Sequence, residues 1–416
     1  MNNRRREMEM GKKKYKIAFI GCGARSISYA APLSQTGEII VAACAEPDIE
    51  NLRTMLSYAG LKEKSVHIYS DWRELCEKEQ ELDGAVVATP NHLHREPAEI
   101  LIRRRIPLAL EKPITTTMED TESILNSVRQ YNSQLLLGFV LRSTPFYRKV
   151  REILDSGLIG SVVSIQADEL VTPGISSVIS RSPWRRFSAM SGGTMMEKCS
   201  HDMDLLNWFA GGRPVAVNSF GGSLLFRPNP GLPQTCDNCP LRKECIYYKE
   251  PVFSKAAGDS VLQKTLHKEL NRCIYNINKD VADNQVVSIL YSNGVLANFT
   301  LAFNCIGERG GRNLHIIGSK GRVWGNIDLN QIGVVENSSG RTQLIDIPVV
   351  KSGHNGGDAA HALMLLRMMK DPSFHPAQDA YAGYLSNAIC IAADISAAQS
   401  RQIHFRYGAN GFITFD

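Results

Sequence analysis

The stretch YKIAFIGCGARS, residues 15–26, decides the fold, because a short apolar run leads through two glycines into a segment of helical composition. Gly21 and Gly23 occupy the first two positions of the G-x-G-x-x-G pattern, in which glycine permits a tight turn and close approach of the backbone to a pyrophosphate. Ser26 stands at the third position, where a small residue still lets the helix pack on the strand. The stretch therefore predicts a dinucleotide site made by Gly21, Cys22, Gly23, Ala24 and Arg25.

The flanking sequence supplies the context that a lone G-x-G pattern lacks, since that pattern also occurs in simple tight turns. Strand-like apolar runs alternate with helical segments, which predicts a doubly wound parallel sheet, a Rossmann domain, over residues 15–140. Glu46 ends the second strand about 25 residues after the loop, at the place where an acid binds ribose hydroxyls. An acid there repels a 2′-phosphate, so the sequence favours NAD over NADP.

Two further loops follow strands of the same predicted sheet. Ligands of such sheets bind beyond the carboxyl ends of the strands, so polar residues in these loops are expected to face the cofactor. The residues concerned are Thr89, Pro90, Asn91 and His94 in ATPNHLH, and Glu111 and Lys112 in EKPITTT. The alternative for Lys112 is a solvated surface charge paired with Glu111.

Composition narrows the class of protein. With 416 residues, of which 43% are apolar, the chain is long enough for two domains with separate cores. Residues 1–14 form a basic lead that is expected to be disordered. Its six basic residues exceed the net charge of +5, so the rest of the chain is close to neutral and nucleic acid is not an expected partner. No apolar run approaches the roughly 20 residues of a membrane span, and ten cysteines without a secretory signal indicate a cytoplasmic protein.

A second polar cluster lies midway along the chain, in GGTMMEKCSHDMD, residues 192–204. Residues three, four and seven positions apart lie on one side of a helix, so Glu197, His201 and Asp204 are expected to converge. A histidine titrates near neutrality and suits general acid–base catalysis. A helix-face histidine supported by an acid one turn away is the structural alternative.

These motifs, in this order and together with GFVLRSTPFYRKVREILDSGLIGSVVSI, resemble the Gfo/Idh/MocA family, named after glucose–fructose oxidoreductase, inositol dehydrogenase and a rhizopine catabolism protein. The resemblance extends over about residues 15–401. It implies a C-terminal α+β domain over residues 141–416 with a large open, mainly antiparallel sheet, whose exposed face packs in a homodimer or homotetramer. A helix at about 378–401 is expected to pack at the domain interface.

The same resemblance implies roles for site residues. The family's catalytic lysine, acid and histidine match Lys112, Glu197 and His201, with Glu in place of the usual Asp. In these roles His201 removes a hydroxyl proton, Lys112 stabilises the alkoxide or shares the proton relay, and Glu197 orients the imidazole. The positions that resemble substrate contacts are His94, Arg142, Trp184, Arg185, His201 and Asp204. Surface arginine and core tryptophan are the structural alternatives.

Four of the ten cysteines lie in an insertion at about residues 227–275, three of them in CDNCPLRKEC. A C-x-x-C pair with two further thiols suits a tetrahedral structural zinc. The spacing therefore predicts a zinc site made by Cys236, Cys239, Cys245 and Cys273. Free thiols, an iron–sulfur cluster and disulfides are the alternatives.

Three functions are compatible with these residues. The first is an NAD-dependent dehydrogenase that takes a hydride from a secondary hydroxyl of a sugar, cyclitol or glycoside. The second is a redox-assisted glycosidase, which oxidises the sugar, eliminates the aglycone, adds water and returns the hydride from the same NADH; a glycoside 3-oxidase is related to it. The third is a sensor of NAD or sugar without catalysis, for which the lysine, acid and histidine together would be unnecessary. No residue decides between the first two.

Overall fold

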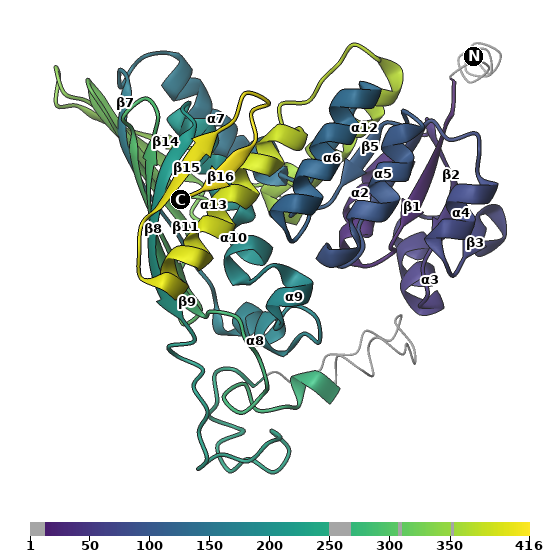
Figure 1. Cartoon of the computed structure of the whole chain (residues 1–416), viewed down its shortest axis with the longest axis horizontal. Coiled ribbons are helices and arrows are strands. Elements are labelled where there is room, and N and C mark those ends of the chain that lie inside the picture. Colours follow the sequence, from purple (N-terminus) through teal and green to yellow (C-terminus); the bar gives the residue numbers. More distant parts are fainter. Residues whose placement is uncertain (1–12, 249–267, 307–309, 351–352) are drawn as a thin grey trace.

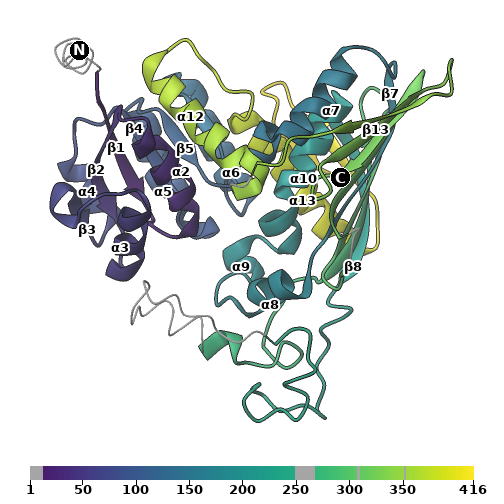
Figure 2. The same cartoon turned by 180° about the vertical axis from the view of Figure 1, so that it is seen from behind.

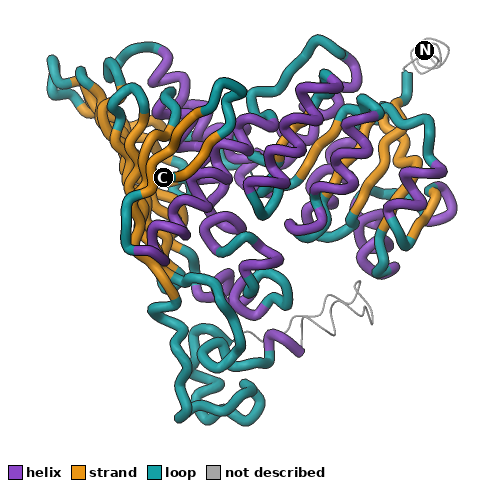
Figure 3. The backbone as a smooth tube through the Cα atoms, viewed as in Figure 1, coloured by secondary structure: helices purple, strands orange, loops and turns teal. Residues whose placement is uncertain are grey.

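The computed structural model describes residues 13–248, 268–306, 310–350 and 353–416. Two β-sheets stand at opposite ends of the molecule, with helices between and around them (Figure 1, Figure 3). This arrangement confirms the predicted class, a doubly wound parallel sheet followed by an α+β domain with a large open sheet.

The N-terminal sheet contains six parallel strands, β1 (Tyr15–Ile20), β2 (Ile39–Ala45), β3 (His67–Tyr69), β4 (Gly84–Val87), β5 (Leu108–Leu110) and β6 (Leu135–Leu137). Its helices are α2 (Ala24–Gln35), α3 (Ile49–Tyr58), α4 (Trp72–Lys78), α5 (Arg95–Arg103) and α6 (Met118–Tyr131). Strands β4, β5 and β6 are buried throughout because helices cover both faces, which explains their continuous apolar sequences. The strand order β3-β2-β1-β4-β5-β6 reverses between β1 and β4, so a ligand crevice is expected at the carboxyl ends of these two strands.

The C-terminal sheet contains ten strands in the order β14-β13-β12-β11-β7-β10-β9-β8-β15-β16. Their bounds are β7 (Val162–Leu170), β8 (Pro214–Gly222), β9 (Asn284–Tyr291), β10 (Leu296–Ala302), β11 (Gly311–Gly318), β12 (Gly321–Asn326), β13 (Gln331–Glu336), β14 (Thr342–Asp346), β15 (Ile403–Tyr407) and β16 (Ile413–Phe415). Only β7 and β10 pair in parallel among these strands. Strands β9 and β10 form one antiparallel hairpin, and β11 and β12 form another.

Burial alternates along the strands of this sheet. In β9 and β10 every second residue is buried, so one face packs on helices and the other is open to solvent. Beyond β6, the helices with bounds in the described residues are α7 (Pro145–Asp155), α8 (Pro173–Arg181), α9 (Ser188–Ser191), α10 (Thr194–Ala210), α12 (Gly357–Lys370) and α13 (Ala380–Gln399). Helices α10 and α13 pack on each other and on the sheet, α10 on β7 and α13 on β8. Because α13 also contacts α6, these helices join the two halves of the molecule.

Helix α12 belongs to the N-terminal core although it lies late in the sequence. It packs on α2 beside the parallel sheet (Figure 2). Its residues Ala362 and Leu365 share one hydrophobic cluster with Ile17 and Phe19 of β1. The chain therefore returns to the Rossmann domain long after the boundary predicted at residue 140.

The remaining segments add little regular structure. Residues 223–248 and 268–283 of the cysteine-containing insertion form mostly loops and turns, with an isolated bridge between Thr235 and Arg272 (Figure 3). Residues 1–12 of the predicted lead lie outside the described residues. Among the described helices, none has the length and apolarity needed to cross a membrane.

Candidate active site

The glycine loop at the end of β1 is shaped for a close approach of the backbone to a ligand. Gly21 has φ +82°, and a Cβ there would come within 2.7 Å of the Ala88 carbonyl oxygen, so only glycine fits. At Gly23 a Cβ would meet nothing within 4 Å, which leaves open space in front of the loop. Helix α2 begins at Ala24 with neither a side-chain cap nor an acid in its first turn, so its N–H groups remain available to an anion.

Glu46 lies beside this loop at the end of β2. Its Oε2 accepts a hydrogen bond of 2.7 Å from the Cys22 N–H, and its Oε1 accepts one of 3.0 Å from the Asp48 N–H. These two bonds fix the carboxylate at the edge of the glycine loop, the position that the ribose role requires.

An ion pair joins the glycine loop to the loop after β5. Arg25 donates from Nε to Oε1 of Glu111 over 3.0 Å, and the Lys112 N–H donates to Oε2 of Glu111 over 3.3 Å. Burial opposes ionisation of Glu111, but the charges of Arg25 and Lys112 outweigh it and lower the pKa of this carboxyl. The peptide bond between Lys112 and Pro113 is cis. Glu111 thus uses its carboxylate within the protein and sets the position of Lys112.

Lys112 reaches from the parallel sheet to α10. Its Nζ donates to the backbone carbonyl of Glu197. The Glu197 carboxylate pairs with Arg185, with 3.0 Å between Oε1 and Nε. Burial lowers the pKa of Lys112, an effect that Glu197 and Glu111 partly offset. Burial opposes ionisation of Glu197 too, but the charges of Lys112, Arg185 and Lys198 outweigh it and lower the pKa of its carboxyl.

His201 lies one turn beyond Glu197 on α10 and is 5% exposed. Its Nδ1 is buried and has no hydrogen-bond partner in the described part of the chain. Burial, followed by the positive charges of Lys112 and Arg312, lowers the pKa of His201 well below 6.5, so its ring is neutral at physiological pH. Within the same residues no hydrogen bond links His201 to Glu197, so the structure lacks the orienting contact expected from the resemblance.

Arg142 and Asp204, both predicted to contact substrate, bind each other. Arg142 lies in the short helix η3 (Val140–Ser143), and its Nε and Nη2 donate to the Asp204 carboxylate over 2.7 and 2.5 Å. Both side chains are buried, and burial raises the pKa of Asp204 to about 6, against the effect of Arg142. Arg142 also donates to the Ala377 carbonyl over 3.2 Å. This pair anchors α10 to the segment that follows β6, and it leaves the carboxylate facing its partner.

The loop after β4 also carries residues whose polar groups are used internally. In His94 the two ring nitrogens lie 2.8 and 3.0 Å from the carbonyl oxygens of Pro113 and Thr89, and the ring is fully buried. Asn91 donates from Nδ2 to the Ser191 carbonyl over 2.9 Å. His94 therefore fastens the two cofactor-side loops to each other, and Asn91 fastens one of them to α9.

Trp184 and Arg185 keep exposed surface beside Glu197. They lie between α8 and α9, and the Arg185 guanidinium stacks over the Trp184 ring at 4.9 Å from its centroid. Arg185 also pairs with Glu197, which places it and Trp184 beside α10. Of the predicted substrate contacts, Trp184 and Arg185 are the two that are not buried.

A buried ion network beneath α10 was missed by sequence reasoning. Lys198 lies 2.9 Å from Glu169 of β7, and Arg312 of β11 lies 2.7 Å from Glu169 and 2.6 Å from Asp202 of α10. The network holds the helix on the sheet. Arg312 and Asp202 are 110 positions apart, so only knowledge that β7 and β11 are neighbours would have indicated it.

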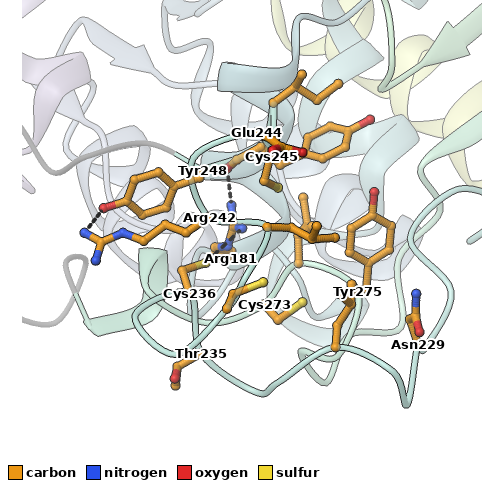
Figure 4. A pocket seen from close by; sticks show the side chains of 16 residues that line it. Arg181, Asn229, Thr235, Cys236, Arg242, Glu244, Cys245, Tyr248, Cys273 and Tyr275 are labelled. Atoms are coloured by element: carbon orange, nitrogen blue, oxygen red, sulfur yellow. Dashed lines mark hydrogen bonds between the residues drawn. The ribbon is translucent and has the colours of Figure 1, made fainter.

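The described residues of the insertion do not support the predicted structural zinc. Cys236, Cys239, Cys245 and Cys273 line one cavity of about 540 Å³ (Figure 4). However, within the described residues no three His, Cys, Asp or Glu side chains are placed to hold a metal ion. Burial raises the pKa of Cys236, and its thiol donates to the Arg272 carbonyl over 3.8 Å.

Comparison with known proteins identifies both halves of the chain. Residues 15–139 match the family model described as "Oxidoreductase family, NAD-binding Rossmann fold". Residues 147–324 match the model described as "GFO/IDH/MocA C-terminal domain". Together the two matches cover most of the chain.

Several curated proteins resemble the chain in part. The oxidoreductase YteT of Bacillus subtilis is 31% identical over 235 residues, 52% of this chain and 54% of that protein. Inositol 2-dehydrogenase of Rhizobium meliloti is 30% identical over 152 residues, 36% of this chain and 44% of that protein. The 2,7-anhydro-N-acetylneuraminate hydratase of Mediterraneibacter gnavus is 25% identical over 149 residues, 35% of this chain and 38% of that protein. The chain thus spans about half the length of the curated relatives it matches.

A solved structure shares the whole fold. Levoglucosan dehydrogenase in complex with NADH and levoglucosan has a TM-score of 0.73 and 18% identity, covering 94% of this chain and 99% of that chain. At this identity the likeness concerns the fold alone.

Proposed function

Because the chain belongs to the Gfo/Idh/MocA family of oxidoreductases, we propose that it is an NAD-dependent enzyme that transfers a hydride from a secondary hydroxyl of a sugar, cyclitol or glycoside to the nicotinamide ring. The observation that carries this proposal is the meeting of Lys112, from the cofactor side, with the α10 helix that bears Glu197 and His201. The relatives named for inositol and anhydro-sugar substrates support the substrate class.

The residues at the glycine loop fit NAD. The open space before Gly23 and the uncapped start of α2 suit a pyrophosphate, and the carboxylate of Glu46 suits the ribose hydroxyls. When bound, NAD supplies the ring carbon that accepts the hydride. The chain's own residues then have to bind the alcohol, remove its proton and stabilise the charge that develops on its oxygen.

His201 is the group that takes the hydroxyl proton. Its neutral ring, kept so by burial and by neighbouring cations, is the form that can accept a proton. Lys112 is buried, and there the charge of its protonated form would stabilise an alkoxide more strongly than it would in water. Glu197 fixes both Lys112, through its carbonyl, and Arg185, through its carboxylate.

A redox-assisted glycosidase is the second candidate. It uses the same three residues, and the hydratase among the relatives carries a name that denotes addition of water to an anhydro sugar. The difference is measurable, because a dehydrogenase releases NADH whereas the glycosidase returns the hydride and releases an aglycone.

The test is turnover of purified protein with NAD and a panel of inositols, free sugars and aryl glycosides. Lys112→Ala and His201→Ala should each lose about two to four orders of magnitude in kcat while still binding NAD. Lys149→Ala, on the exposed surface of α7, and His404→Ala, on the exposed side of β15, are matched controls that should keep wild-type turnover. Wild-type turnover in both site variants would refute the assignment.

A further inference from the structure

His354 lies next to His201 and has a carboxylate partner. It is part of the turn η4 (Gly353–Gly356) before α12, and its side chain is 36% exposed. Its Nδ1 lies 2.9 Å from Oδ1 of Asp358, in the first turn of α12. A histidine that is fixed by a carboxylate and remains open to water is equipped to pass protons.

The same ring lies beside His201. The two ring centroids are 6.0 Å apart, with 51° between the ring planes. No direct hydrogen bond joins the two rings in the described residues, so the link between them that we consider is one bridging water. His201 itself is buried, and its Nδ1 has no partner in the part of the chain that the structure describes. A proton placed on His201 therefore needs another group through which to leave.

Asp358 is held in place from both domains. The Nη1 of Arg25, in the first turn of α2, donates to both carboxylate oxygens over 3.1 and 3.3 Å. A Cβ at position 353 would lie 2.1 Å from Oδ2 of Asp358, so Gly353 makes room for the carboxylate. Burial opposes ionisation of Asp358, but His354 and Arg25 lower its pKa to about 2. It is therefore a permanent anion beside His354.

The backbone around His354 is held in an uncommon conformation. His354 and Asn355 have φ of 47° and 49°, and Gly356 has φ +89°, so three consecutive residues are left-handed. Left-handed backbone is disfavoured for residues with a Cβ and persists where surrounding structure requires a particular geometry. The next residue, Gly357, lies so close to η3 that a Cβ there would be 2.6 Å from the Val140 carbonyl oxygen. The turn is thus fixed against the junction of the two domains.

We propose that His354, held by Asp358, is the outlet for the proton that His201 takes from the substrate hydroxyl. The inference rests on the proposed function. In one turnover the C–H bond breaks as hydride goes to NAD, and the O–H proton moves to His201. The N–H bond of His201 then breaks as its proton passes through one water to His354, and from there to bulk solvent. The sum is oxidation of the alcohol to a ketone, reduction of NAD to NADH and release of one proton.

The charged groups that face this route are few. Asp358 faces His354 from α12, and Arg25 faces Asp358 from α2. From the opposite side His201 is approached by Lys112 and Arg312, whose charges discourage it from keeping a proton. These cations favour departure of the proton from the buried His201 ring.

The experiment uses the full chain, NAD and whichever alcohol of the panel the wild type oxidises best. His354→Ala should lower steady-state kcat by about tenfold to a hundredfold with little change in KM. Its first turnover should survive as a burst of one NADH per site, because His201 still accepts the first proton. Added imidazole, and a series of substituted imidazoles, should restore kcat. Asp358→Asn should give a smaller loss of the same kind.

A matched control is available at the far edge of the Rossmann sheet. There His67 of β3 also pairs with a carboxylate, 2.6 Å from Oε1 of Glu79, but away from the site. His67→Ala should leave kcat unchanged.

Each other outcome is decisive. Wild-type kcat in His354→Ala overturns the outlet, and so does a loss that imidazole does not restore, because that result indicates a purely structural role. A wild type that oxidises no member of the panel refutes the proposed function, and the outlet with it. The two failures are distinguishable because the first leaves wild-type turnover intact.

Discussion

A buried histidine predicts a measurable dependence of stability on pH. His361 of α12 is 0% exposed, both of its ring nitrogens lack partners among the described residues, and its ring packs edge-on to Tyr29 of α2. Burial is the main reason that its pKa is lowered from 6.5 to about 4. It sits where α12 packs on the Rossmann core, next to Glu111 and Arg25, so its protonation bears on the interface that positions Lys112.

The sign and size of this dependence of stability on pH follow from the linkage between folding and proton binding. The unfolded chain binds a proton at this histidine below pH 6.5, whereas the folded chain does so only near pH 4, so stability falls as pH drops between these values. At about pH 5 the difference amounts to about 2 kcal/mol of unfolding free energy. His361→Leu removes this penalty and also removes two unpaired polar atoms. The variant should therefore be at least as stable as wild type at about pH 7.5, and its advantage should grow by about 2 kcal/mol at about pH 5.

Urea unfolding of both proteins at the two pH values provides the measurement. Every other titrating group, His201 included, is present in both proteins and cancels in the difference. His404→Leu, on the exposed side of β15, controls for the substitution itself. An advantage of His361→Leu that is the same at both pH values would refute the reasoning.

Three further predictions concern the site. Burial and neighbouring cations lower the pKa of His201 well below 6.5, so its proton-accepting form persists as the pH falls. The value of kcat/KM should therefore stay constant down to pH 6.5 and decline only at lower pH. A decline centred above pH 6.5 would contradict this prediction. Because of Glu46, the protein should bind NAD more tightly than NADP in a fluorescence titration, and Glu46→Gln should weaken NAD binding by about tenfold. Tighter binding of NADP by the wild type would contradict the proposed role of Glu46. Arg142→Met should lower the unfolding free energy by about 3–5 kcal/mol at about pH 8, because Asp204 is left buried without its partner. If urea unfolding shows a loss below about 1 kcal/mol, the pair does not anchor α10.

Local patterns in the sequence were sufficient for much of the fold. The run from Tyr15 to Ser26 predicted a strand, a glycine turn and a helix, and the structure has β1, the turn and α2 in these places. The two hairpins of the second sheet were likewise readable from alternating residues and turns. These features depend on neighbours in the sequence, and so a single sequence contains the information.

The partners of individual side chains were not readable in the same way. Helical spacing placed Glu197, His201 and Asp204 on one side of α10, but it did not show that Asp204 binds Arg142, 62 positions away. The spacing of the cysteines suggested a metal, yet it did not show that Cys236 faces the Arg272 carbonyl. The return of α12 to the Rossmann core, which brings Asp358 to Arg25, depends on a pairing 333 positions apart. Such contacts follow from the tertiary arrangement, which local periodicity does not specify.

The most direct measurement of the central claim is NADH absorbance with simultaneous detection of aglycone, for wild type and Lys112→Ala, with NAD and the panel of inositols, sugars and aryl glycosides. Our account predicts that wild type forms NADH in proportion to the alcohol oxidised, and that Lys112→Ala binds NAD but forms NADH at least about a hundredfold more slowly. Release of aglycone with catalytic NAD and no net NADH would identify the glycosidase instead. Equal rates in the two proteins would contradict the claim that Lys112 and the α10 helix form the active site.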